Sequence, residues 1–280
     1  MSQASSLIVT KANGERVPFD GSKLVHSLSR AGAPPDVAER IRQEITQDLH
    51  TGISTRRIYQ QAFNLLRKYS RPLAAKYKLK RAVRELGPSG YPFEHFVGAL
   101  LQRHGYEVQV GVQVEGRCIT HEVDVLGDKD GHRIAVECKF GATNHKRLDV
   151  KVSLYIRSRV QDLIDRWQSE PGGDSRSYQG WIVTNGSFSA DAAEYGTCAG
   201  LKLMGWNYPR QGNLKDFIEH TGLYPITTLI TLTKAEKKEL LQQNLVLVQH
   251  LHEDPRPLEA LQLSPSRLRK TREEIEALCF

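Results

Sequence analysis

Two segments decide the predicted fold: His121-Glu122-Val123-Asp124-Val125 and Ile134-Ala135-Val136-Glu137-Cys138-Lys139-Phe140. Apolar and polar residues alternate in both segments, a period that is typical of a strand with one buried face. The connection between them, residues 127–131, is rich in Gly and Asp, so we expect a five-residue loop there. The two segments are therefore predicted to pair as a β-hairpin.

Polar side chains of this hairpin form a candidate cation site. Glu122 and Asp124 project from one face of the first strand, and Glu137 and Lys139 project from one face of the second. Where these faces meet, three carboxylates and one ammonium group converge, and clustered carboxylates repel one another unless a cation holds them. Oxygen ligands of this kind favour Mg²⁺ or Mn²⁺. The alternative is a cross-strand salt bridge on a solvated sheet face, which contributes only about 0–1 kcal/mol.

The order of these residues resembles a known nuclease motif. Asp124, followed on the next strand by Glu137-Cys138-Lys139, resembles the PD-(D/E)xK motif, and residues 91–222 resemble the Mrr-like restriction endonucleases. The segments that support this resemblance are Phe93-Glu94-His95-Phe96-Val97, Leu100-Leu101, Gly105-Tyr106 and Ile182-Val183-Thr184-Asn185. Many Mrr-like proteins carry Gln at the position of Glu137, so this chain departs from them in a way that favours a working metal site.

The resemblance implies a role for each of these residues. Asp124 and Glu137 would bind a divalent metal ion together with the main-chain carbonyl of Cys138. Lys139 would orient the attacking water or offset charge on the phosphorus, and Glu122 would complete the ligand shell directly or through water. A divalent cation serves such a reaction as a Lewis acid, as a generator of hydroxide and as a template. The implied substrate is DNA.

Further charged residues are expected close to this site. Glu94 lies on the first helix, where relatives sometimes add an acidic ligand, although a surface position is the favoured interpretation. Five basic residues suit contacts with a phosphate backbone that read no base: Lys146, Arg147, Lys151, Arg157 and Arg159.

Residues 1–86 are predicted to form a separate small domain. Strands are expected over residues 7–10 and 16–19, on either side of the strong turn signal Asn13-Gly14. Four helices follow, over residues 21–31, 35–49, from a capping Thr55 onward, and 72–86. Residues 56–84 contain ten Lys or Arg and no Asp or Glu, a composition that suits phosphate binding. A solvated helix face is the alternative explanation of this charge run.

This domain resembles the ATP cone, a nucleotide-sensing module of ribonucleotide reductases and their transcriptional repressors. The resemblance rests on Val9-x-Lys11, Asn13-Gly14, Phe19, Lys23 and Gly52-Ile53-x-Thr55. It implies that Lys11, Lys23 and Thr55 contact the triphosphate of ATP or dATP, with Arg84 as a further cation. Ala12 stands where the family usually has Arg, which leaves the preferred base open.

The remaining organisation predicts a chain of the α/β class. Residues 87–90, Gly-Pro-Ser-Gly, form a linker, and residues 91–222 are expected to build helices around a mixed central sheet, as in the restriction endonucleases. Residues 223–280 are predicted to form a helical C-terminal extension, with a capping signature at Thr233 and Glu236. This extension faintly resembles helix-hairpin-helix DNA-binding tails, but packing or dimerisation is favoured, so self-association into a homo-oligomer stays open.

Composition narrows the classes of function. The 280 residues carry a net charge of +7, and no apolar run approaches the roughly 18–20 residues of a membrane span, so no membrane partner is expected. The N-terminus lacks the basic start and apolar stretch of a secretory signal, and the four cysteines form no CxxC pair. We therefore expect a cytoplasmic protein.

These observations together predict a metal-dependent DNA endonuclease that is regulated by ATP or dATP. One alternative is a nucleotide-responsive DNA-binding regulator with an inactive nuclease fold, but the intact set Asp124, Glu137 and Lys139 argues against it. A second alternative is an RNA-processing nuclease. The sequence identifies no group that would read a 2′-hydroxyl, so it does not distinguish RNA from DNA as the substrate.

Overall fold

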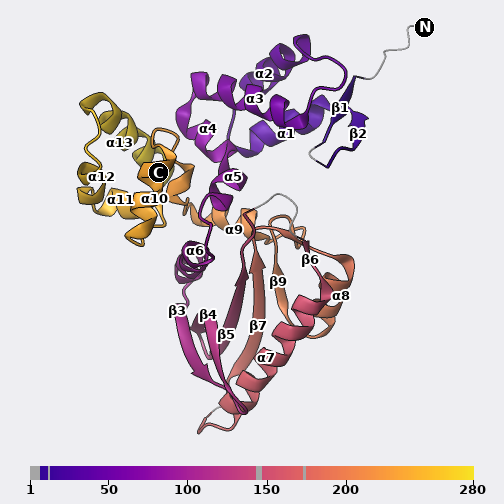
Figure 1. Ribbon diagram of the computed structural model, residues 1–280, viewed down its shortest axis with the longest axis vertical. Helices are drawn as coiled ribbons and strands as arrows, with labels where there is room; N and C mark the ends of the chain where they lie inside the picture. Colours follow the sequence, from indigo (N-terminus) through magenta and orange to yellow (C-terminus); the bar gives the residue numbers. More distant parts are fainter. Residues whose placement is uncertain (1–6, 12, 143–146, 173–174) are drawn as a thin grey trace. The chain divides into compact units, whose positions relative to one another are not determined.

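The computed structural model describes residues 7–11, 13–142, 147–172 and 175–280. These residues belong to two compact units, Met1–Leu79 and Lys80–Phe280, whose elements are labelled in Figure 1.

The first unit consists of a small hairpin and four helices. Strands β1 (Ile8–Thr10) and β2 (Arg16–Pro18) pair antiparallel, and Gly14 has a positive φ of 85° in the turn between them, as the Asn-Gly signal predicts. The helices that follow are α1 (Gly21–Arg30), α2 (Pro35–Gln47), α3 (Thr55–Tyr69) and α4 (Arg71–Tyr77). Their core includes Leu28, Ile45 and Leu66, which are fully buried.

Two details of this unit differ from the sequence-based expectation. The N-cap of α3 is Ser54, whose side chain accepts a hydrogen bond from the main-chain N–H of Arg57 at 3.2 Å, so Thr55 is the first helical residue and not the cap. The single helix predicted over residues 72–86 is divided into α4, which ends at Tyr77 with Lys78 as its C-cap, and α5 (Leu79–Arg84). All of α5 except Leu79 belongs to the second unit.

The second unit is built on a mixed five-stranded sheet, as predicted. Its strand order is β3 (Glu107–Glu115), β4 (Thr120–Lys129), β5 (His132–Lys139), β7 (Ser177–Thr184) and β9 (Lys202–Met204). The first three strands pair antiparallel, and β5, β7 and β9 pair parallel. Two short strands, β6 (Arg147–Leu148) and β8 (Ser187–Phe188), form a separate parallel pair.

Helices cover both faces of this sheet (Figure 1). Helix α6 (Tyr91–Arg103) lies against β3 and β4. Helix α7 (Val150–Gln168) packs on the other face, where Ile156 and Val160 share a core cluster with Ala135 and Ile182 of the sheet. Helix α8 (Ala190–Cys198) lies beside α7, and α9 (Leu214–Thr221) lies beside α6.

The hairpin that joins β4 to β5 is tighter than the sequence predicted. Its turn consists of only Asp130 and Gly131, with φ values of 49° and 74°, and both strands run up to it. Two consecutive positive φ values are typical of a type I′ turn, for which Asp-Gly is a favoured pair. Gly127 belongs to β4 and not to the loop, because it pairs with Val108 of β3 and with Ile134 of β5.

Valine alternates with other residues along strand β3, but these valines do not all face the same side of the sheet. Val108 and Val110 lie against Gly98 of α6, whereas Val112 and Val114 pack against the core cluster beneath α7. The change of face occurs at Gly111, whose φ of 64° is left-handed. A strictly alternating pattern therefore conceals a change of face at its central glycine.

The C-terminal extension is helical, as predicted. It contains a short 3-10 turn (Ile226–Thr228) and helices α10 (Lys234–Gln242), α11 (Val248–Glu253), α12 (Arg256–Ala260) and α13 (Pro265–Cys279). The predicted capping box is present, because the side chains of Thr233 and Glu236 each accept a main-chain N–H of the other residue. Within the described residues, we find no helix with the length and hydropathy that crossing a bilayer requires.

Candidate active site

Asp124 lies where strands β4 and β5 separate. The last pair of their ladder on this side is Val125 with Val136. Beyond it, the main-chain N–H of Cys138 donates a hydrogen bond of 2.7 Å to the Asp124 carboxylate, at a position where a regular ladder would offer a main-chain carbonyl. Asp124 is also the residue opposite Gly111 at the one position missing from the β3–β4 pairing. The end of the β4–β5 ladder and the missing β3–β4 pair therefore place this carboxylate between neighbouring strands.

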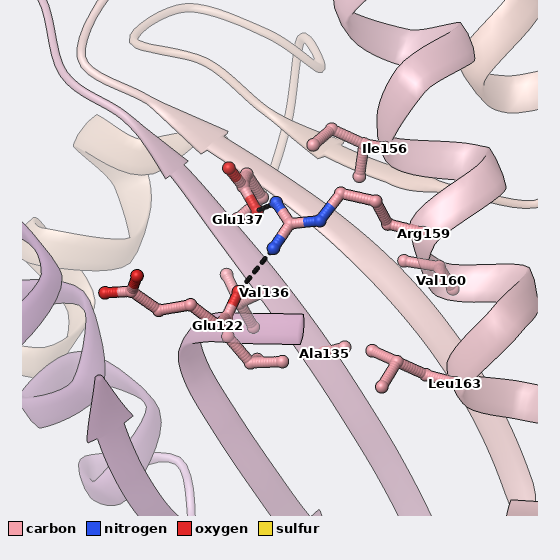
Figure 2. A pocket seen from close by; sticks show the side chains of 9 residues that line it. Glu122, Ala135, Val136, Glu137, Ile156, Arg159, Val160 and Leu163 are labelled. Atoms are coloured by element: carbon pink, nitrogen blue, oxygen red, sulfur yellow. Dashed lines mark hydrogen bonds and ion pairs between the residues drawn. The ribbon is translucent and has the colours of Figure 1, made fainter. Parts of the chain in front are cut away.

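Glu137 is held by two cations. Its Oε1 accepts a hydrogen bond from the Lys139 ammonium group, and its Oε2 lies 2.6 Å from Arg159 Nη1 of α7. A second nitrogen of Arg159 donates to the main-chain carbonyl of Glu122 (Figure 2). The Glu137 side chain is only 12% exposed, so this ion pair is largely shielded from water.

Electrostatic interactions connect four carboxylates at this place. Burial, together with the negative charge of Glu137, raises the pKa of Asp124 to about 6, although the hydrogen bond from the Cys138 N–H acts in the opposite direction. Burial, together with the negative charges of Asp124, Glu122 and Glu137, raises the pKa of Glu94 on α6 to about 7. Acidic groups therefore outweigh Lys139 and Arg159 in this cluster, and a cation would relieve their repulsion.

The residues predicted for this site have different positions within it. Asp124, Glu137 and Lys139 lie near one another, as expected from the hairpin. Glu122 contributes its carbonyl to Arg159, while its exposed side chain points away from that arginine in Figure 2. Glu94, for which the sequence favoured a surface position, is only partly exposed and lies near enough to the other acids to feel their charge.

The donor set fits a hard divalent cation. Carboxylate and carbonyl oxygens are the ligands that Mg²⁺ and Mn²⁺ prefer, and Asp124, Glu137 and the Cys138 carbonyl can provide them. In the described part of the chain, however, no three His, Cys, Asp or Glu residues form a ready metal-binding group. Each oxygen of Glu137 already has a cationic partner, so a metal ion would compete with these cations for the carboxylate.

The ion pair of Arg159 with Glu137 was not anticipated from the sequence. Arg159 was expected only as one of several basic residues, of which Arg147 lies on β6 and Lys151 and Arg157 on α7. The available signal was its place between Ile156 and Val160 in the buried stripe of α7. Lys146 lies outside the described residues.

The residues predicted to bind a nucleotide are found at the ends of several elements. Lys11 follows β1 and pairs with Glu15 at 3.1 Å, and Lys23 lies in the first turn of α1, 3.5 Å from Asp20. A bridge between Thr10 and Ser54 brings the end of β1 beside the start of α3, where Thr55 lies. Helix N-termini attract phosphate groups through their free N–H groups. The last of these residues, Arg84, lies on α5 in the second unit.

Comparison with known families agrees with this organisation. The family model of the ATP cone domain matches residues 7–86, that of a restriction endonuclease domain matches 87–206, and that of the AF1548-like C-terminal domain matches 224–279. An uncharacterized protein of Archaeoglobus fulgidus is 35% identical over 150 residues, which are 52% of this chain and 78% of that protein.

A solved structure supports the same grouping. The crystal structure of AF1548, a protein of unknown function, aligns with a TM-score of 0.55 at 32% identity over 68% of this chain and 98% of its own. The chain therefore belongs to the AF1548-like family and carries an ATP cone in front of a restriction endonuclease domain of the Mrr type. These domains confirm the resemblances drawn from the sequence and indicate a nuclease with nucleotide-binding regulation. The predicted domain limits at residues 86, 90 and 222 stay predictions.

Proposed function

We propose that this protein is a divalent-metal-dependent endonuclease that hydrolyses phosphodiester bonds of DNA. The observation that carries the proposal is the position of Asp124 at the separation of β4 and β5, beside Glu137 and Lys139. A solvated cross-strand salt bridge does not explain this arrangement, because Asp124 is partly buried with a pKa raised to about 6 and bonds a main-chain N–H instead of a cation.

In this proposal the chain's own residues divide the work. Asp124, Glu137 and the Cys138 carbonyl would hold the ion, and Glu94 reaches the same cluster of charges from α6. The bound ion would supply Lewis acidity and a template for the phosphate group. Lys139 is 31% exposed beside Glu137, so its ammonium group can turn toward a phosphate, orient a water molecule and offset developing negative charge.

The ATP cone provides the regulatory part of the proposal. Lys11, Lys23 and Thr55 are the proposed contacts of the triphosphate of ATP or dATP, with Arg84 as a further cation. Their support is the match to the ATP cone family and the position of Lys23 and Thr55 in the first turns of α1 and α3. Bound nucleotide would alter the cleavage rate by favouring one arrangement or assembly state of the protein.

The direct test is cleavage of supercoiled plasmid and of single-stranded DNA with Mg²⁺, with Mn²⁺ and with EDTA. We expect cleavage that depends on the metal ion and that is lowered by about 10²-fold or more in Lys139→Ala, since that change removes an electrostatic contribution to the transition state. Plasmid binding by that variant should be nearly unchanged. Cleavage that persists in EDTA would rule out the proposed chemistry.

A further inference from the structure

Arg159 joins the two strands beyond the point where their ladder ends. The β4–β5 pairing stops at Val125 and Val136, and past this pair one guanidinium group bonds both the Glu122 carbonyl on β4 and the Glu137 carboxylate on β5. Figure 2 shows the side chain reaching from α7 between these two groups. The guanidinium also lies 5.5 Å from the centre of the Tyr155 ring, which restricts its position further.

This contact places a fixed positive charge on a proposed metal ligand. The Arg159 side chain is 18% exposed, and a guanidinium group stays charged at every accessible pH. Among the residues that the structure describes, the carboxylates of Glu94, Glu122, Asp124 and Glu137 form a cluster with two cations, Arg159 and Lys139. The guanidinium therefore offsets part of the repulsion that a bound divalent ion would otherwise offset.

We propose that Arg159 is a positioning residue that competes with the metal ion for Glu137. In the metal-free protein it holds the Glu137 carboxylate beside the end of β4 and compensates the acidic cluster. Metal binding then requires that Glu137 exchange its guanidinium partner for the ion, which sets the metal concentration at which the site fills. This inference rests on the proposed function, because it presupposes a metal ion between Asp124 and Glu137.

We expect removal of the Arg159 guanidinium group to strengthen metal binding. Arg159→Met keeps the length of the aliphatic side chain but removes the charge and both hydrogen bonds. We expect Mg²⁺ and Mn²⁺ to bind this variant roughly tenfold more tightly than the wild type, because one competing positive charge is absent from a partly shielded site. Arg159→Lys keeps the charge on a more mobile group and should stay within about threefold of the wild type.

Isothermal titration calorimetry of the full chain with Mg²⁺ or Mn²⁺ alone, without nucleic acid, measures this effect. Arg166→Met is a matched control, because Arg166 lies on the same helix and pairs with the exposed Glu115 at 3.6 Å. A merely structural role of Arg159 predicts weaker metal binding as the site loosens, so the direction of the change separates the two roles.

The possible titration results distinguish the role of Arg159 from the proposed metal-dependent function. Unchanged or weaker metal affinity in Arg159→Met, with a melting temperature close to that of Arg166→Met, would overturn the inference alone. If Arg159→Met fails to fold, Arg159→Lys decides the question, because loss of affinity there by tenfold or more contradicts competition through charge. Absence of metal binding in the wild type as well would overturn both this inference and the proposed function.

Discussion

The placement of Asp124 depends on a residue that carries no side chain. Gly111 lies opposite it on β3, at the one position missing from an otherwise continuous register, and has a left-handed φ of 64°. The strand changes face there, so that Val110 lies toward α6 and Val112 toward α7. On β4 the same change separates Val123, which belongs to the core beneath α7, from Val125, which lies against α6. Asp124 is thereby freed to point between the strands.

Gly111→Ala tests this dependence at the level of one residue. No atom lies within 4 Å of the position that its Cβ would occupy, so the cost is backbone strain of about 1–2 kcal/mol. We expect that loss of stability in urea unfolding and a fall in metal-dependent cleavage of at least about tenfold, because relief of the strain displaces Asp124. Gly111→Asn should lose less of both, since Asn tolerates the left-handed region better. Equal cleavage by Gly111→Ala and the wild type would show that Asp124 is positioned independently of this glycine.

Individual residues also show what the sequence could and could not reveal. The alternation of residues on two paired strands predicted that Asp124, Glu137 and Lys139 would meet, but their register was not predictable, because it depends on the length of the turn. The partner of Arg159 was not predictable, because it depends on how α7 crosses β4 and β5. Thr55 was mistaken for a cap because Ser54, an equally good capping residue, precedes it.

At the scale of elements, the helices were the more predictable part. Signals that are local in the sequence located α1, α2 and α10. The turn between β4 and β5 was misjudged because Gly127 resembles a loop residue, whereas it lies in β4, where a Cβ would approach the Ile134 side chain to 3.0 Å. Contacts of that kind arise only when distant residues pack together.

The C-terminal helices offer a prediction about pH. Arg267 of α13 bonds both carboxylate oxygens of Glu236 in α10, at 2.9 and 2.8 Å, and this contact is the main reason why the pKa of Glu236 falls to about 2. Since the folded-state pKa lies below the ordinary value of 4.5, the interaction is fully present above about pH 4.5 and is lost as the pH falls toward 2. We expect Glu236→Gln to lower the free energy of unfolding by about 1 kcal/mol at pH 7 and by clearly less at pH 3. Urea unfolding at both pH values checks this, and a difference that does not depend on pH would contradict the assignment.

The whole molecule combines a nucleotide-sensing unit and a nuclease domain in the same chain. The ATP cone occupies residues 7–86 by its family match, and the candidate active site lies on β4 and β5 of the second unit. Combination of the two in one chain is the reason to expect coupling, and coupling requires that bound nucleotide interact differently with two states of the protein.

This coupling predicts a nucleotide effect that depends on the ATP cone. Millimolar ATP or dATP should change either the cleavage rate or the assembly state measured by light scattering, by at least about fivefold in rate or by a shift in mass. Lys23→Ala should abolish that change without altering cleavage in the absence of nucleotide, because Lys23 is 84% exposed in the first turn of α1. Cleavage and assembly that are both indifferent to nucleotide would refute the regulatory part of the proposal.

The proposed function requires that Asp124 belong to a catalytic metal site. Its most direct test compares plasmid cleavage by Asp124→Asn with that by Asp128→Asn, a substitution of the same size on the same strand, where Asp128 pairs with Arg133 at 2.8 Å. We expect a loss of about 10³-fold or more in Mg²⁺-dependent cleavage for Asp124→Asn and a change of less than about threefold for Asp128→Asn. Equal cleavage by the two variants would contradict that requirement.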